Sequence, residues 1–237
     1  MNEYKLPEGH VLCLRTNDTN NQSRDGFQWP ESGECVAPDW SSSPICGYGL
    51  HGLLWGTGDS SLLNWSDDAK WLVVEVSADS VVDLSDKVKF PRCKVVYCGN
   101  RLGATGLMHR IAPNGSAVIG GTATTGYRGT ATAGYRGTAT TGDRGTATTG
   151  EYGTATAGEY GTATAGDRGT ATAGEYGTAI TGDYGTATAG EYGILQLTYW
   201  DIGSGRSRIV TKYVGEDGIN PNTPYTIDKH GNVTEGD

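Results

Sequence analysis

The sequence predicts a mainly β protein that is organised around a central β-solenoid. Residues 121–192 form nine consecutive octads, in which positions one, two, three and six are always Gly, Thr, Ala and Gly. Only Ile180 replaces the Thr at position four. Self-similarity at a short fixed period is typical of solenoids, whose repeats are stable only when stacked on their neighbours. We therefore expect a solenoid between a small α+β N-terminal domain and a C-terminal β-hairpin cap.

The composition divides the 237 residues into three expected domains, 1–112, 113–192 and 193–237. All five Cys and both Phe lie in the first, so we expect a conventional hydrophobic core there. The octads contain no Leu, Val, Phe or Trp, and apolar residues return after residue 193. Residues 113–120 have the length of one octad and are expected to form a first, irregular repeat.

The Thr-Ala-Thr triplet of each octad alternates with a period of two, which predicts a short strand with Thr on one face and Ala on the other. Position five then shares the Ala side. Small side chains allow a thin, close-packed interior, whereas buried Thr hydroxyls would need partners, so we expect Ala inside and Thr outside. Two octads suffice for a coil of two strands and two turns, and three octads per coil is the alternative. Gly at positions six and one is expected to supply positive φ in the turns.

This arrangement predicts two kinds of exposed surface. One consists of outward Thr rows, for which the candidate binding residues are Thr130, Thr132, Thr146, Thr148, Thr162 and Thr164. The other lies at the turns, where alternate octads share an edge and three position-eight residues form an unbroken row, Tyr160, Tyr176 and Tyr192. On the opposite edge Arg168 separates Tyr152 from Tyr184. An exposed aromatic row with charged flanks is typical of an interface, here one between two copies of the chain.

Outside the octads, patterns of apolar residues and turn residues predict short elements. Strands are expected over 11–15, 26–30, 35–40, 70–76, 81–84 and 94–98, and short helices over 60–65 and 103–111. The strand over 70–76 is almost continuously apolar, so we expect it inside its sheet. A hairpin is expected over 193–214, and at most one more over 224–234.

His51 stands in a Gly-rich segment, 46–56, of the kind in which ligand-binding and catalytic residues are often found. No acid or nucleophile stands at a diagnostic spacing from it, so we expect His51 to be structural or ligand-positioning and expect no catalytic residue. The favoured interpretation is a packed turn in which His51 hydrogen-bonds to backbone, and the alternative is a His51 that positions a ligand. No Cys or His spacing matches a paired metal signature, and neither a metal nor a cofactor is expected.

The net charge of −9 is spread over all three parts of the chain, which disfavours a basic groove and therefore direct nucleic-acid binding. There is no apolar run of about 18 residues and no apolar leader after Met1, so we expect neither a membrane protein nor a secreted one. The expected location is the cytoplasm of a bacterial cell.

Residues 132–140, Thr-Ala-Gly-Tyr-Arg-Gly-Thr-Ala-Thr, resemble in register the Ala-Gly-Tyr-Gly-Ser-Thr-x-Thr octapeptide of bacterial ice-nucleation proteins. Nearly the whole chain also resembles phage and bacterial proteins of unknown function that join a Gly-Leu-His domain, here residues 49–51, to such octads. The first resemblance implies ice binding by the Thr rows. The second implies a gene carried by a phage or mobile element. The order of elements around 49–51 also resembles ADP-ribosyltransferase folds, although their glutamate-centred motif is not recognisable here.

The leading functional hypothesis is a non-enzymatic interaction protein whose regular surface binds a macromolecular partner, in particular a protein or a second copy. Regularity motivates it, because catalysis needs one singular site whereas a repeated surface suits repeated contacts. The first alternative is ice binding through the Thr rows. The second is an acidic mimic of nucleic acid that inhibits a host defence enzyme, for which the octads supply seven acids against four Arg.

Overall fold

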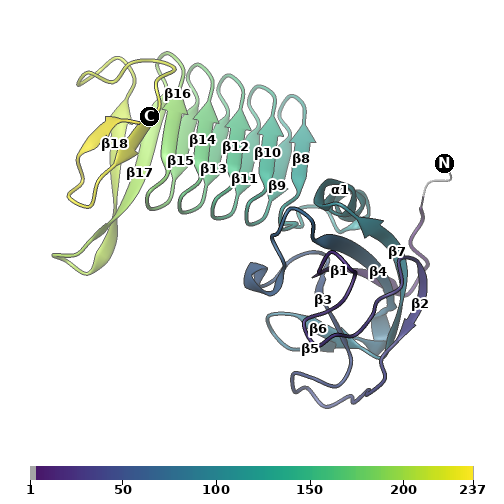
Figure 1. Cartoon of the computed structure of the whole chain (residues 1–237). Coiled ribbons are helices and arrows are strands. Elements are labelled where there is room, and N and C mark those ends of the chain that lie inside the picture. The colour runs from purple at the N-terminus through teal and green to yellow at the C-terminus, as the bar shows by residue number, and fades with distance from the viewer. Residues whose placement is uncertain (1–3, 237) are drawn as a thin grey trace. The chain divides into compact units, whose positions relative to one another are not determined.

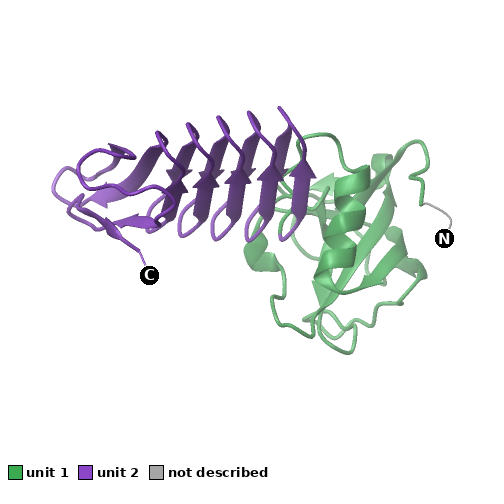
Figure 2. Ribbon diagram, turned by 90° about the horizontal axis from the view of Figure 1, so that it is seen from above, with its two compact units in different colours: residues 1–119 green, residues 120–237 purple. Residues whose placement is uncertain are grey.

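The computed structural model describes residues 4–236. The chain divides between residues 119 and 120 into two compact units (Figure 2). The first is an antiparallel sheet with one α-helix, and the second is a β-solenoid that ends in hairpin strands (Figure 1). Each unit has a hydrophobic core of its own. The predicted fold class is confirmed.

The N-terminal unit contains one seven-stranded sheet in the order β2-β7-β4-β1-β3-β6-β5, with every neighbouring pair antiparallel. The strands are β1 His10–Asn17, β2 Gly33–Val36, β3 Leu50–Leu54, β4 Lys70–Ser77, β5 Val82–Asp83, β6 Val88–Phe90 and β7 Arg92–Gly99. β4 lies inside the sheet, as its apolar run predicts, and its residues 71–74 are all buried.

One α-helix, α1 Arg101–Ile111, packs against β4 and β7. It begins at Asn100, whose side chain accepts a hydrogen bond from the N–H of Gly103 at 2.9 Å, the usual way to satisfy a helix N-terminus. Leu107 and Met108 are among the residues that it buries. Two 3₁₀ turns, η1 Ser60–Leu62 and η2 Ala78–Ser80, complete the unit.

Several local predictions for the first unit differ from the structure. The strand β3 was not predicted, the strand expected over 35–40 is β2 at 33–36, and the helix expected over 60–65 is the 3₁₀ turn η1. Residues 26–30 form no strand, and only Gln28 makes an isolated bridge, to Gln22. The carbonyl oxygens of Trp29 and Pro30 accept hydrogen bonds from the Asn21 side chain rather than from the backbone of a neighbouring strand. The three-residue strand β6 was not predicted. Residues 113–120, the expected irregular repeat, contain no strand; Ile119 is buried and donates its N–H to the carbonyl oxygen of Gly56 in the N-terminal unit.

In the second unit, each octad contributes one four-residue strand, β8 Thr122–Thr125, β9 Thr130–Ala133, β10 Thr138–Thr141, β11 Thr146–Thr149, β12 Thr154–Ala157, β13 Thr162–Ala165, β14 Thr170–Ala173, β15 Thr178–Thr181 and β16 Thr186–Ala189. Strands of odd-numbered octads (β8, β10, β12, β14, β16) form one parallel sheet, and those of even-numbered octads (β9, β11, β13, β15) form the other. We call them the odd and even sheets. Two octads therefore make one coil, as predicted, and about five turns span residues 122–197.

The interior of the solenoid is filled by Ala, as predicted. Position three is buried to 0 or 1 % exposure from Ala131 onward, and position five faces the same interior. Four position-five residues are Thr rather than Ala, and their hydroxyl oxygens are buried without a hydrogen-bond partner in the described chain: Thr125, Thr141, Thr149 and Thr181. The interior therefore contains a few unpaired hydroxyl groups among the Ala side chains.

The turns differ from the prediction. In all nine octads the left-handed residue is the Arg or Tyr at position eight, with φ between +52° and +58°, whereas no Gly at position six or one has positive φ. These Gly residues are needed for space. A Cβ on Gly166 would lie 2.7 Å from the backbone nitrogen of Glu151 in the preceding coil, and one on Gly137 would lie 2.6 Å from the Cβ of Ala133.

Antiparallel strands close both sheets at the C-terminal end. β17 Ile194–Asp201 extends the even sheet in parallel with β15 and pairs antiparallel with β18 Arg206–Tyr213. β19 Tyr225–Ile227 pairs antiparallel with β16 and with β20 Val233–Glu235. Leu195 and Leu197 bring larger side chains into the core at this end. The two predicted hairpins are confirmed.

Candidate functional site

The outward Thr side chains lie in straight rows because identical octad positions face each other in neighbouring coils. Thr138 pairs with Thr154, and Thr140 pairs with Thr156, through parallel strands. Adjacent rows are therefore ~4.8 Å apart, and the two Thr of one strand are ~6.7 Å apart. The result is a two-dimensional array of hydroxyl and methyl groups on each outer face.

The six Thr named from the sequence all lie on the even face, the outer surface of β9, β11, β13 and β15, and are half-buried or exposed. That face is interrupted at Ile180 on β15. The odd face, the outer surface of β8, β10, β12, β14 and β16, is uninterrupted and carries ten Thr, namely Thr122, Thr124, Thr138, Thr140, Thr154, Thr156, Thr170, Thr172, Thr186 and Thr188. The location of Ile180 in octad eight is the sequence signal that distinguishes the faces.

The position-eight side chains form one column along each edge. The odd column consists of Arg128, Arg144, Tyr160, Tyr176 and Tyr192. Its last three rings are stacked, with centroids 4.9 Å apart for the first pair and 5.1 Å for the second, and interplanar angles of 6° and 15°. About half of each of the first two rings is exposed, 51 % for Tyr160 and 48 % for Tyr176. The arrangement agrees with the predicted row, and whether it is an interface stays a prediction.

The even column consists of Arg136, Tyr152, Arg168 and Tyr184. The guanidinium of Arg168 lies 5.6 Å from the ring centroid of Tyr152 and 5.5 Å from that of Tyr184. Its Nη1 also donates a 2.9 Å hydrogen bond to the hydroxyl of Tyr152. Arg168 therefore connects the two rings by cation–π contacts, where the sequence suggested only a break.

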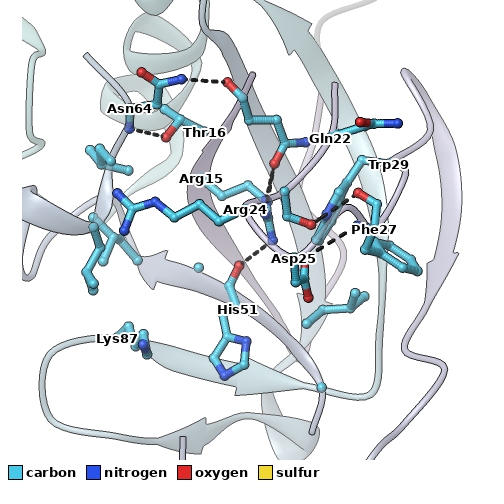
Figure 3. Close-up of a pocket in the computed structure, with 18 of the residues that line it drawn as sticks. Arg15, Thr16, Gln22, Arg24, Asp25, Phe27, Trp29, His51, Asn64 and Lys87 are labelled. Atoms are coloured by element: carbon cyan, nitrogen blue, oxygen red, sulfur yellow. Dashed lines mark hydrogen bonds between the residues drawn. The ribbon is translucent and has the colours of Figure 1, made fainter. Parts of the chain in front are cut away.

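His51 lies on β3, in the wall of a cavity of about 1220 Å³ in the N-terminal unit (Figure 3). Its carbonyl oxygen accepts a hydrogen bond from Nη1 of Arg15 at 3.0 Å. Its ring Nε2 is buried and has no hydrogen-bond partner among residues 4–236, so this nitrogen does not make the expected hydrogen bond to backbone. The cavity wall also includes Arg24, Phe27 and Lys87.

No sequence pattern groups these side chains, because they come from β1, from the loop that follows it, and from the approach to β6. The strands bring them together only through the β1–β3 and β3–β6 pairings. Among residues 4–236 there is no group of three or more His, Cys, Asp or Glu that could hold a metal ion. Cys46, the cavity's thiol, is exposed, whereas Cys35 and Cys93 face each other across β2 and β7.

In the described part of the chain, no helix is long and apolar enough to cross a membrane.

Comparison with known proteins gives two kinds of match. The family described as Domain of unknown function (DUF7666) matches residues 11–110. An ice nucleation protein of Pseudomonas syringae is 40% identical over 97 residues, which are 40% of this chain and 8% of that protein. An ice nucleation protein of Xanthomonas campestris pv. translucens is 39% identical over 93 residues, which are 38% of this chain and 6% of that protein. Ice nucleation protein InaU of Pantoea ananas is 38% identical over 103 residues, which are 42% of this chain and 10% of that protein.

The chain thus spans a tenth or less of the length of these relatives. No solved structure matches it. The chain is a β-solenoid protein with distant partial similarity to bacterial ice nucleation proteins, and its residues 11–110 match the family described as DUF7666.

Proposed function

We propose that the solenoid binds ice, through a layer of ordered water held on the odd face. The observation that carries this proposal is the uninterrupted register of ten outward Thr on five adjacent strands. None of their hydroxyl groups makes a hydrogen bond to another group of the described chain, so water satisfies them. Regularly spaced hydroxyl and methyl groups on a flat, stiff sheet are suited to hold water molecules at lattice-like positions.

The curated relatives support the same activity, because ice nucleation is the property for which they are named. Five strands at ~4.8 Å give a face about 20 Å long. Such a short face suits adsorption to ice that already exists better than nucleation, which requires a large cluster of ordered water.

Thermal hysteresis and inhibition of ice recrystallisation test the proposal with the full chain. The double variant Thr154→Lys, Thr156→Lys places two bulky charges in the middle row of the odd face and should abolish both activities. The matched control Thr146→Lys, Thr148→Lys makes the same change on the even face and should keep most of the activity. A wild-type protein without either activity, or equal loss in both variants, contradicts the proposal.

A second proposal is self-association through the odd column, as the interaction hypothesis for the solenoid requires. The observation in its favour is the stack of three half-exposed Tyr rings, with Arg144 adding a cation–π contact 4.9 Å from the ring of Tyr160. A twofold dimer would set this patch against its own copy, since an interface of this symmetry uses the same residues on both subunits. It would also bring two solenoids side by side and enlarge the surface that they present.

The mass in solution tests self-association. We expect a dimer for the wild type, a monomer for the double variant Tyr160→Ser, Tyr176→Ser, and a dimer for the control Tyr184→Ser in the even column. A monomeric wild type would refute the dimer, and a dimer that survives the double change would move the interface elsewhere.

A further inference from the structure

The cavity beside His51, which we call the His51 cavity, has a wall with positive charge that lacks an anionic partner. Arg15 donates from Nη2 to Oδ1 of Asn17 at 2.8 Å and from Nη1 to the carbonyl of His51 at 3.0 Å. Its guanidinium carbon lies 3.7 Å from the ring centroid of Trp29. All three partners are uncharged, so they orient the guanidinium without neutralising it.

A second cation lies next to this wall. Lys89 is 0 % exposed, and its Nζ donates to the carbonyl oxygens of Ile45 at 2.8 Å and Gly47 at 3.2 Å. Within residues 4–236, ion pairs shorter than 4.0 Å involve neither Arg15 nor Lys89. Buried charges are normally paired, because an unpaired charge loses its hydration without compensation. The charges of Arg15 and Lys89, which are buried without an ion-pair partner, therefore favour an anion close to them.

Three carboxylates also line the cavity, those of Asp18, Asp25 and Asp39. Two of them are engaged in local turns. Oδ1 of Asp18 accepts from the N–H groups of Asn20 and Gln22 at 2.9 and 2.7 Å, and Oδ1 of Asp25 accepts from that of Phe27 at 3.4 Å. These acids stabilise the loop after β1 and form no ion pair with the cations of the wall.

The pKa of His51 depends on the charges around it. Burial lowers its pKa, and the charges of Lys87, Arg15 and Lys89 lower it further, whereas Asp25 acts in the opposite direction. The lowered pKa favours the neutral ring, whose Nε2 is buried and lacks a partner in the described chain. A buried polar atom without a partner in a cavity is a site at which a ligand can supply the missing hydrogen bond.

The cavity also exposes aromatic rings. Gly47, Tyr48 and Gly49 have φ of 96°, 54° and 142°, an unfavourable backbone for Tyr that leaves its side chain 63 % exposed beside the cavity. Phe27 is half-buried in the opposite part of the wall. Strained backbone is concentrated at ligand sites, and exposed aromatic rings offer stacking surfaces for flat ligands.

We propose that the His51 cavity binds a phosphorylated small molecule with a flat ring, of the size of a nucleotide. Its phosphate lies in the positive field of Arg15 and Lys89 and accepts hydrogen bonds from the cationic groups of Arg24 and Lys87, which line the cavity (Figure 3). His51 Nε2 bonds to the ligand, and the ring stacks on Phe27 or Tyr48. The cavity volume of about 1220 Å³ exceeds the ~300–1,000 Å³ of ordinary small-molecule sites, so size does not limit it. This function is independent of the one proposed for the solenoid.

Calorimetric titration of the full chain tests the proposal with ADP, inorganic phosphate and adenosine as probes. ADP should bind, with a Kd that rises with salt concentration, and phosphate should compete with it. Adenosine should bind at least about tenfold more weakly than ADP, because it lacks the charge-assisted hydrogen bonds. Failure of ADP to bind, or adenosine binding as tightly as ADP, overturns the proposal.

Variants identify the site. The double variant Arg24→Gln, Lys87→Gln removes two cations without touching the core and should raise the Kd for ADP by about tenfold or more. His51→Gln should also raise it. The control Lys94→Gln removes an exposed charge on β7, outside the cavity, and should leave the Kd unchanged. An equal loss of affinity in Lys94→Gln would show a general attraction between charges. Unaltered binding by the double variant would place the ligand elsewhere. Either result refutes the site.

Discussion

At the scale of single residues, the octad separates two tasks that Gly often performs together. Its Gly residues allow close approach between coils, while the left-handed position is occupied by Arg or Tyr at a cost of ~1–2 kcal/mol each. The position-eight N–H compensates by donating to the position-seven carbonyl of the next coil, for example from Tyr152 to Asp167 at 2.9 Å. The side chain at position eight can then serve the surface columns.

A Cβ at position six should destabilise the solenoid wherever a preceding coil exists. Gly166→Ala would place its Cβ 2.7 Å from the backbone nitrogen of Glu151, and we expect a loss of about 1–3 kcal/mol in the free energy of unfolding. Gly126→Ala is the matched control, because nothing lies within 4 Å of a Cβ at that position in the first coil. Denaturant unfolding of both variants measures the difference, and equal effects would contradict this explanation of the Gly pattern.

Removal of an unpaired buried hydroxyl should stabilise the solenoid. Thr149→Val keeps the shape of the side chain and removes an Oγ1 that is buried without a partner, so we expect a gain of about 1 kcal/mol. Thr148→Val makes the same change on the outer face, where water satisfies the hydroxyl, and should be close to neutral. Thermal unfolding compares the two, and no difference between them would show that the hydroxyl of Thr149 is satisfied.

These details mark the limit of what the repeat pattern reveals at this scale. The period of two places Ala131 inside and Thr130 outside, and both assignments are confirmed. Invariant Gly, in contrast, is compatible with positive φ or with close approach, and one coil viewed alone cannot distinguish them. The contact that decides, between Gly166 and Glu151, joins residues fifteen positions apart.

At the scale of elements, adjacent coils are connected by side chains as well as by the backbone. Each position-seven Asp accepts a hydrogen bond at Oδ1 from a backbone N–H of the next coil: Asp143 from Glu159 at 3.1 Å, Asp167 from Asp183 at 2.8 Å, and Asp183 from Trp200 at 3.2 Å. The shorter Asp side chain reaches this N–H, and no such bond is found for the Glu at the same position in the described octads. The choice between the two acids at position seven is therefore structural.

Loss of this side-chain contact should weaken one coil boundary. Asp167→Ala should lower the free energy of unfolding by about 0.5–1.5 kcal/mol, the usual net value of a hydrogen bond. Glu175→Ala, at the equivalent position of the next octad, removes the same charge without such a bond and should have little effect. Hydrogen exchange at the N–H of Asp183 provides a local readout; unchanged protection in Asp167→Ala would contradict the role.

Prediction from sequence succeeded where an element's own periodicity determines it and failed where distant groups do. β4 and α1 were predicted because their apolar residues and boundaries are local. The strand expected over 26–30 did not form, because the Asn21 side chain bonds to its carbonyls. The His51 cavity was not predicted, since its charge results from Arg15 and Lys89, which lie far from His51 in the sequence.

At the scale of the whole molecule, the two units differ in how they respond to acid. In the N-terminal unit, burial lowers the pKa of His51 and of His109, and the Nε2 of each is buried without a partner in the described chain. In the second unit the shifted acids are Asp201, with a pKa lowered to about 2, and Asp228, held low by hydrogen bonds with Asn232. Of these four groups, only His51 and His109 have an ordinary pKa, 6.5, near neutral pH.

The sign of the effect follows from linkage between protonation and folding. A histidine whose pKa is lower in the folded state binds protons more readily when unfolded, so stability is complete above the ordinary pKa of 6.5 and is lost as pH falls toward the folded value. The lowered carboxyl pKa values stabilise the second unit down to the ordinary value of 3.8 and lose effect only below it. Between pH 7 and pH 5, acid should therefore destabilise the first unit and spare the solenoid.

Calorimetry of the full chain at pH 7 and pH 5 should show this difference as a lowered melting temperature for the N-terminal unit alone. The variant His51→Gln, His109→Gln should reduce the shift, because it removes both buried imidazoles. His230→Gln, in the exposed turn between β19 and β20, is the matched control and should keep the shift. A solenoid transition that moves as far as the N-terminal one, or an undiminished shift in the double variant, would show that these histidines do not control the response. Separate responses would mean that mild acid can unfold the N-terminal unit while the Thr faces stay intact.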